Sequence, residues 1–73
     1  MSIPEMENVE SSNVESIGYD DSIETAYVRY LNGSLYMYKG VPNWEYDNLR
    51  NAPSIGSYLH RNFKNVYPYE RIE

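Results

Sequence analysis

The sequence predicts an α+β fold, in which a small antiparallel sheet of about three strands precedes two short helices and an extended C-terminal segment. A central Asn-Gly pair separates two segments rich in β-forming residues, which is the strongest short-range signal of a β-hairpin. After residue 43 the apolar residues follow a helical period instead. Because 73 residues bury only a marginal core, we also expect a homo-oligomer.

The N-terminal residues differ in composition from the rest of the chain. Residues 1–12 are acidic, contain serine and show no apolar periodicity, so we predict a flexible tail that pairs, if anywhere, near Val9. A single domain then covers residues 13–73. Its first strand is predicted over residues 14–19, because Asp20 opens a turn in which aspartate side chains bond the nearby backbone.

The hairpin is formed by the segments ETAYVRYL and SLYMYKG around Asn32-Gly33. Its loop length decides which side chains share a face of the sheet. A two-residue turn gathers one apolar face, made of Ala26, Val28, Tyr30, Leu35 and Met37. A three-residue loop, Leu31-Asn32-Gly33 with a glycine bulge, gathers a different face, made of Ala26, Val28, Tyr30, Tyr36 and Tyr38. The residues alone are compatible with both registers.

Two short helices are predicted after the hairpin. Asn43 can cap the first, WEYDNLRNA, and Pro53 ends it. Ser54 can cap the second, IGSYLHRNFKN. Its inner face is predicted to contain Ile55, Tyr58, Leu59 and Phe63. The final segment VYPYERIE is short and interrupted by proline, so we expect an extended tail that packs back on the domain or on a neighbouring subunit.

The order and spacing of the words SSNVESIGYD, NGSLYMYKGVP, NAPSIGSYLHRNF and YPYERI resemble those of the KTSC domain family. The family takes its name from the C-terminal module of some lysyl-tRNA synthetases and also occurs as free-standing small proteins of bacteria and phages. The resemblance covers residues 11–72 and implies a compact α+β fold. It favours the three-residue loop, with Tyr36 and Tyr38 on the main packing face, and its synthetase context suggests RNA binding.

The charge distribution argues against a long polyanion as the partner. The net charge is −5, and residues 1–37 carry seven acidic residues against Arg29 alone, whereas residues 38–73 carry four against five basic residues. Long nucleic acids are bound through many Lys and Arg contacts on a basic surface. A ligand with one or two phosphates needs only two or three basic groups.

Three features suggest a binding site, and each also has an ordinary structural explanation. The tyrosines, Tyr36 and Tyr38 among them, can stack on a base or simply fill the core. In PSIGS, a helix start can bind phosphate or be capped by Ser54. Gly56 weakens a helix by ~0.5–1 kcal/mol relative to alanine, so we expect a close approach there by a ligand, a backbone or another subunit. The predicted ligand-binding residues are Tyr36, Tyr38, Ser54, Gly56, Ser57, Tyr58, Arg61 and Lys64.

Catalysis is not predicted. The chain has no cysteine and one histidine, His60, so we expect neither a metal site nor a cofactor, and no nucleophile–base pair is recognisable. No signal peptide or membrane span is recognisable, so we expect a cytoplasmic protein, in the host cytoplasm if a phage encodes it. The predicted function is capture of a small nucleotide-type ligand, conceivably as a phage sponge for a cyclic nucleotide defence signal. The alternatives are an RNA- or tRNA-binding accessory module and a protein-interaction module.

Overall fold

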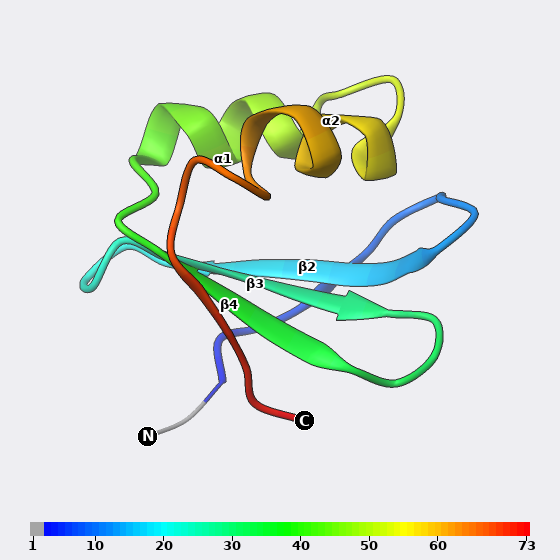
Figure 1. The fold of residues 1–73 in the computed structure, drawn as a ribbon, viewed down its shortest axis with the longest axis horizontal. Helices are drawn as coiled ribbons and strands as arrows, with labels where there is room; N and C mark the ends of the chain where they lie inside the picture. The colour runs from blue at the N-terminus through cyan, green and yellow to red at the C-terminus, as the bar shows by residue number, and fades with distance from the viewer. Residues whose placement is uncertain (1–2) are drawn as a thin grey trace.

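The computed structural model describes residues 3–73 and has two helices on one face of an antiparallel sheet (Figure 1). The five strands lie in the order of the chain, β1-β2-β3-β4-β5. Their bounds are Glu7–Asn8 (β1), Val14–Asp20 (β2), Thr25–Tyr30 (β3), Leu35–Lys39 (β4) and Tyr69–Arg71 (β5). Helix α1 covers Asn43–Arg50, and helix α2 covers Ile55–Asn62. The predicted α+β class is therefore confirmed.

The prediction of about three strands is wrong, because two short strands pair along the edges of the central three. Strand β1 lies within the predicted tail and pairs with β2, Glu7 opposite Ile17. Strand β5 lies in the final segment and pairs with β4, Tyr69 opposite Tyr38. Each has only two or three residues, which is too short for alternation of apolar and polar residues to be recognised.

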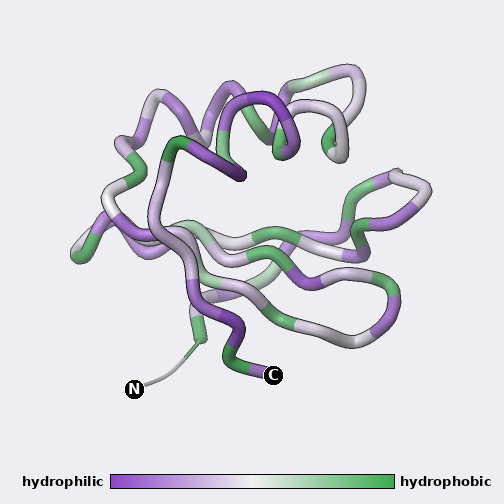
Figure 2. The backbone as a smooth tube through the Cα atoms, viewed as in Figure 1, coloured by the Kyte–Doolittle hydropathy of each residue, from purple (hydrophilic) through white to green (hydrophobic). Residues whose placement is uncertain are grey.

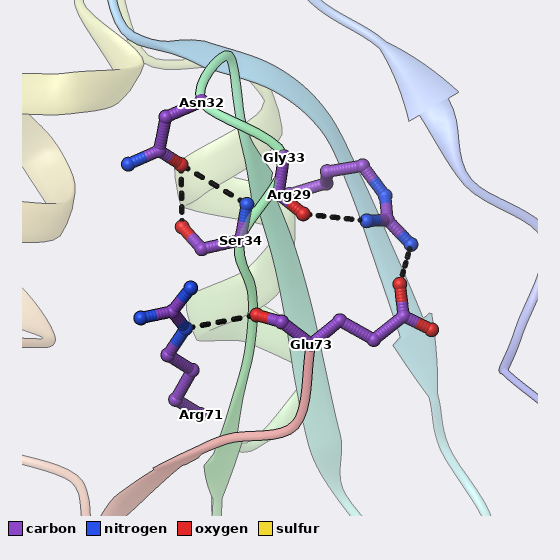
Figure 3. A network of polar contacts seen from close by, with 6 residues as sticks. All are labelled: Arg29, Asn32, Gly33, Ser34, Arg71 and Glu73. Atoms are coloured by element: carbon purple, nitrogen blue, oxygen red, sulfur yellow. Dashed lines mark hydrogen bonds and ion pairs between the residues drawn. The ribbon is translucent and has the colours of Figure 1, made fainter.

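The hairpin between β3 and β4 has the three-residue loop. Val28 lies opposite Tyr36 and Ala26 opposite Tyr38, and the Tyr30 N–H donates to the Ser34 carbonyl at 2.9 Å. Gly33 has a φ of +92°, a left-handed conformation that glycine adopts without the steric cost of a Cβ. The side-chain oxygen of Asn32 accepts from the Ser34 N–H and hydroxyl (Figure 3).

This loop is also tied to the C-terminal end of the chain. The Arg29 guanidinium donates to the Gly33 carbonyl at 2.9 Å and to the Glu73 carboxylate at 2.7 Å, and Arg71 donates to the Glu73 backbone carbonyl (Figure 3). The Leu35 N–H donates to the same Glu73 carbonyl at 3.1 Å. These bonds hold the segment that follows β5 against β4 and the hairpin.

A β-bulge in β2 directs its apolar residues to the helices. Val14 pairs with Tyr30 but Ser16 pairs with Arg29, so Glu15 is an extra residue. In a regular strand, residues three apart point to opposite faces. The bulge lets Val14 and Ile17 both enter the core, where each is almost completely buried.

The main core lies between the sheet and the helices, and Figure 2 shows apolar segments of the helices and strands facing each other there. Buried residues of this core include Val28, Tyr38, Leu49, Leu59 and Phe63. Phe63 contacts the ring of Tyr38 edge to face, with the centroids 5.4 Å apart.

The opposite face of the sheet is partly covered by the N-terminal segment. A Cβ on Gly18 would lie 2.6 Å from the Met6 sulfur and 3.0 Å from the Glu5 carbonyl oxygen. Tyr27, opposite Gly18 in β3, is also buried. Glycine at position 18 therefore lets residues 4–6 lie directly on the sheet.

The two helix starts differ from each other. The predicted cap by Asn43 is wrong, because Pro42 precedes the first turn of α1 and no side chain caps it; the Pro42 carbonyl accepts from the Glu45 and Tyr46 N–H groups. The predicted cap by Ser54 is confirmed, since its hydroxyl accepts from the Ser57 N–H at 3.3 Å. Within residues 3–73, neither helix has the length and apolar character to cross a membrane.

Candidate functional site

Two grooves adjoin each other where α2 passes the loops at one end of the sheet. The first, of about 630 Å³, lies among α2, the β3–β4 hairpin and β5, and we call it the tyrosine groove. It is lined by Ser12, Asn13, Tyr30, Leu31, Asn32, Ser34, Tyr36, Tyr38, Gly56, Leu59, His60, Lys64 and Tyr69. The second, of about 530 Å³, surrounds the start of α2, and we call it the serine groove. It is lined by Glu10, Ser11, Ser12, Asn13, Pro53, Ser54, Ile55, Gly56, Ser57, His60 and Arg61.

The tyrosines of the first groove form a connected set of rings. Tyr30 and Tyr36 meet edge to face at 5.5 Å between centroids. Tyr69 lies 5.8 Å from Tyr36 and 5.7 Å from Tyr38, with tilted rings. Tyr38 is only 5% exposed, whereas Tyr69 is 53% exposed. The set therefore has one ring fixed in the core and another with a face open to solvent.

The hydroxyl of Tyr38 stays protonated at neutral pH. Burial raises the pKa of Tyr38 well above its ordinary value, and the hydrogen bond with Tyr30 adds to the shift. The two hydroxyl oxygens lie 3.5 Å apart. A neutral hydroxyl can donate a hydrogen bond and does not repel an anion.

The predicted site residues fall into three places. Tyr36, Tyr38 and Lys64 line the tyrosine groove, and Gly56 lines both grooves. The serine groove contains Ser54, Ser57 and Arg61. Tyr58 lines neither groove, and its hydroxyl donates to Glu45 on α1.

The expected close approach at Gly56 is made by the side chain of Asn13. A Cβ on Gly56 would lie 2.8 Å from the Asn13 side-chain oxygen, which also accepts from the Ser11 hydroxyl. Asn13 is attached to the hairpin as well, since its backbone carbonyl accepts from the Leu31 N–H at 2.9 Å. Asn13 thus lies where the two grooves meet.

Lys64 and Arg61 differ from most other basic residues of the chain. Arg29, Lys39 and Arg50 each form an ion pair with a glutamate. Over residues 3–73, neither Lys64 nor Arg61 takes part in such a pair, and both are exposed. Their charges are therefore available to an external anion.

A buried carboxylate that lines neither groove was not expected from the sequence. Glu45, on α1, is 7% exposed and accepts hydrogen bonds from the hydroxyls of Tyr58 and Tyr67, the latter at 2.9 Å. We call these three residues the glutamate clasp. It joins both helices to the segment that leads into β5, and so to Tyr69 of the tyrosine groove.

The clasp predicts a loss of stability at alkaline pH. Burial, and then the hydrogen bond to Glu45, raise the pKa of Tyr67 from 10.0 to about 12. Because folding raises this pKa, the stabilisation is complete below pH 10 and is lost as the pH rises to about 12. Urea unfolding across this range should show the free energy of unfolding falling less steeply in Tyr67→Phe than in the natural protein. Equal slopes would contradict the prediction.

A metal site would need several ligating side chains close together among the described residues. Across residues 3–73, no group of three His, Asp or Glu side chains comes close enough to hold a metal ion.

Comparison with known proteins gives the same architecture. The family model described as the KTSC domain matches residues 10–67. The chain belongs to the KTSC domain family. The crystal structure of a KTSC domain protein from Yersinia pestis superposes with a TM-score of 0.88 at 28% sequence identity, covering 94% of this chain and 97% of that one.

Relatives of this chain include a protein of similar length and a much longer one. A protein of Stutzerimonas stutzeri is 35% identical over 66 residues, which are 89% of this chain and 93% of that protein. A lysine–tRNA ligase of Nostoc sp. is 33% identical over 63 residues, or 86% of this chain. The chain spans only 11% of the length of that ligase.

Proposed function

We propose that this KTSC domain is a non-enzymatic module that binds a small nucleotide-type ligand in the tyrosine groove. The observation that carries the proposal is the charge of the groove lining. The chain has 11 acidic and 6 basic residues, yet the tyrosine groove is lined by Lys64 and His60 and by no aspartate or glutamate. On a chain with a net charge of −5, a groove that is lined by a lysine and by no carboxylate favours a small anion.

The tyrosines supply a surface for a flat, aromatic part of the same ligand. Stacking of a base on an aromatic side chain contributes ~1–3 kcal/mol in proteins that bind single strands. Tyr69, which is about half exposed, offers a ring face on which a base can stack. The Tyr38 hydroxyl in the same groove can donate a hydrogen bond to the ligand. Lys64 would then hold a phosphate at the end of the groove nearer α2.

An RNA- or tRNA-binding accessory module is the second candidate. It is favoured by the likeness to lysine–tRNA ligases, in which a module of this kind is part of a longer chain. It requires many phosphate contacts, whereas three of the six basic residues here pair with glutamates. Binding of RNA would fall steeply with salt, and binding of a mononucleotide through Lys64 would fall only slightly.

Thermal unfolding with the common ribonucleoside monophosphates, and with short RNA oligomers in parallel, tests the proposal. We expect one mononucleotide to raise the melting temperature, because a ligand that binds only the folded state stabilises it. Lys64→Ala and Tyr69→Ala should each weaken binding about fivefold or more, since a charge-assisted hydrogen bond and a stacked base each contribute at least ~1 kcal/mol. Light scattering on the same samples reports whether the protein is the expected homo-oligomer.

Lys39→Ala is the matched control for Lys64→Ala. Lys39 is also exposed but is on β4, outside both grooves, and pairs with Glu70. Removing its charge should leave mononucleotide binding unchanged. Equal losses in the two variants, or no stabilisation by any mononucleotide, would overturn the proposal.

A further inference from the structure

The two grooves form one continuous surface. Ser12, Asn13, Gly56 and His60 line both of them. The Asn13 side chain lies against Gly56 at this boundary, and the His60 side chain is exposed there. A ligand in the tyrosine groove can therefore extend past these residues into the serine groove without leaving the protein surface.

The serine groove has a different chemistry from the tyrosine groove. It contains no aromatic ring apart from the shared His60, and its lining includes four serines and Arg61. Hydroxyls and a guanidinium suit a sugar–phosphate unit, whereas they offer little area for stacking a base. Its single carboxylate, Glu10, can accept hydrogen bonds from ribose hydroxyls.

Each groove is lined by one lysine or arginine that forms no ion pair with a described residue. Lys64 lines the tyrosine groove and Arg61 lines the serine groove, and neither is paired with an acidic residue within residues 3–73. Arg61 is in the last turn of α2, and Lys64 follows two residues after Asn62, where that helix ends. The surface therefore offers two separate contacts for anions, Lys64 in the tyrosine groove and Arg61 in the serine groove.

We propose that a single ligand with two phosphates, a dinucleotide, spans both grooves. A base stacks on the tyrosines, and one phosphate contacts Lys64. The chain of the ligand passes the exposed His60 and Asn13, which line both grooves, and the second phosphate contacts Arg61. This inference rests on the proposed function and specifies the ligand class for the same site. Linear 5′-phosphorylated and cyclic dinucleotides share this chemistry.

Calorimetric titration separates the contributions of the two grooves. The probes are mononucleotides, linear dinucleotides with and without a 5′-phosphate, and cyclic dinucleotides. We expect a dinucleotide with two phosphates to bind at least tenfold more tightly than the matching mononucleotide. Arg61→Ala should remove most of this advantage and leave mononucleotide affinity unchanged, because only the second phosphate reaches Arg61. Lys64→Ala should weaken both ligands.

Arg50→Ala is the matched control, since Arg50 is exposed on α1 and outside both grooves. Mononucleotide binding that is no weaker than dinucleotide binding, with no effect of Arg61→Ala, would overturn this inference and leave the proposed function intact. Absence of binding by every probe would overturn both. If a linear or a cyclic dinucleotide binds more tightly, and Arg61→Ala weakens its binding, the inference is supported and the preferred form of the dinucleotide is identified.

Discussion

Replacement of Phe63 by alanine is expected to remove most of the stability of the domain. Phe63 is fully buried, and its ring contacts those of Tyr38, Tyr58 and Tyr67 at centroid distances of 5.4, 6.2 and 5.2 Å. Phe→Ala substitutions in protein cores cost about 3–5 kcal/mol. Small domains have total stabilities near the lower end of roughly 5–15 kcal/mol. The variant should therefore be largely unfolded or unfold at a much lower urea concentration.

Urea unfolding followed by tyrosine fluorescence or circular dichroism measures this change. Trp44→Ala is a suitable control, because it also removes a large aromatic side chain, but one that is 62% exposed. Its effect should stay within about 0.5 kcal/mol. If Phe63→Ala were as mild as Trp44→Ala, the core described here between sheet and helices would be wrong.

The second large effect is expected at Glu45. In Glu45→Ala the hydroxyls of Tyr58 and Tyr67 lose their common acceptor, and hydrogen bonds to a charged group contribute about 1.5–3 kcal/mol each. We expect a loss of about 3 kcal/mol in the free energy of unfolding. The substitution should also weaken ligand binding, because Tyr67 leads through Pro68 to Tyr69 in the tyrosine groove.

Asp47→Ala is the control for this substitution. Asp47 is on the same helix and carries the same charge, but its side chain is exposed. A double-mutant cycle between Glu45→Ala and Tyr67→Phe isolates the pairwise contribution. Purely additive effects of the two substitutions would show that the clasp does not act as a unit.

The class of the fold could be predicted from the sequence, because its signals are local. The Asn32-Gly33 pair, the cap at Ser54 and the helical spacing of Ile55, Leu59 and Phe63 each act over a few residues. The hairpin register could not be decided from the residues alone, because both loops leave an acceptable apolar face. In the structure it follows from the left-handed Gly33 and the Asn32 side chain that bonds Ser34.

The rest of the fold depends on contacts between distant residues. The position of Val14 and Ile17 requires a bulge at Glu15, and strands β1 and β5 exist only because edges of the central sheet accept them. The role of Glu45 depends on Tyr67, 22 residues away. In the sequence, Glu45 could be interpreted only as an acidic residue early in a helix.

Only part of the candidate site could be predicted, because its lining also depends on contacts between residues that are distant in the sequence. Lys64 and Arg61 stood out as basic residues near the end of the second helix, and Tyr36 and Tyr38 as ring-bearing residues of the hairpin. Tyr58 is predicted both on the inner face of the second helix and among the ligand-binding residues, and in the structure its hydroxyl donates to Glu45. Asn13 has no signal in the sequence, because its place between the grooves arises from the approach of its side chain to Gly56.

An amide NMR titration with the mononucleotide that stabilises the protein most would test the central claim most directly. If the ligand binds in the tyrosine groove, the signals of His60, Lys64 and Tyr69 should shift with saturation, and those of Arg29 and Lys39, outside both grooves, should stay in place. Shifts confined to residues outside the tyrosine groove, or no shifts at saturating ligand, would contradict the claim.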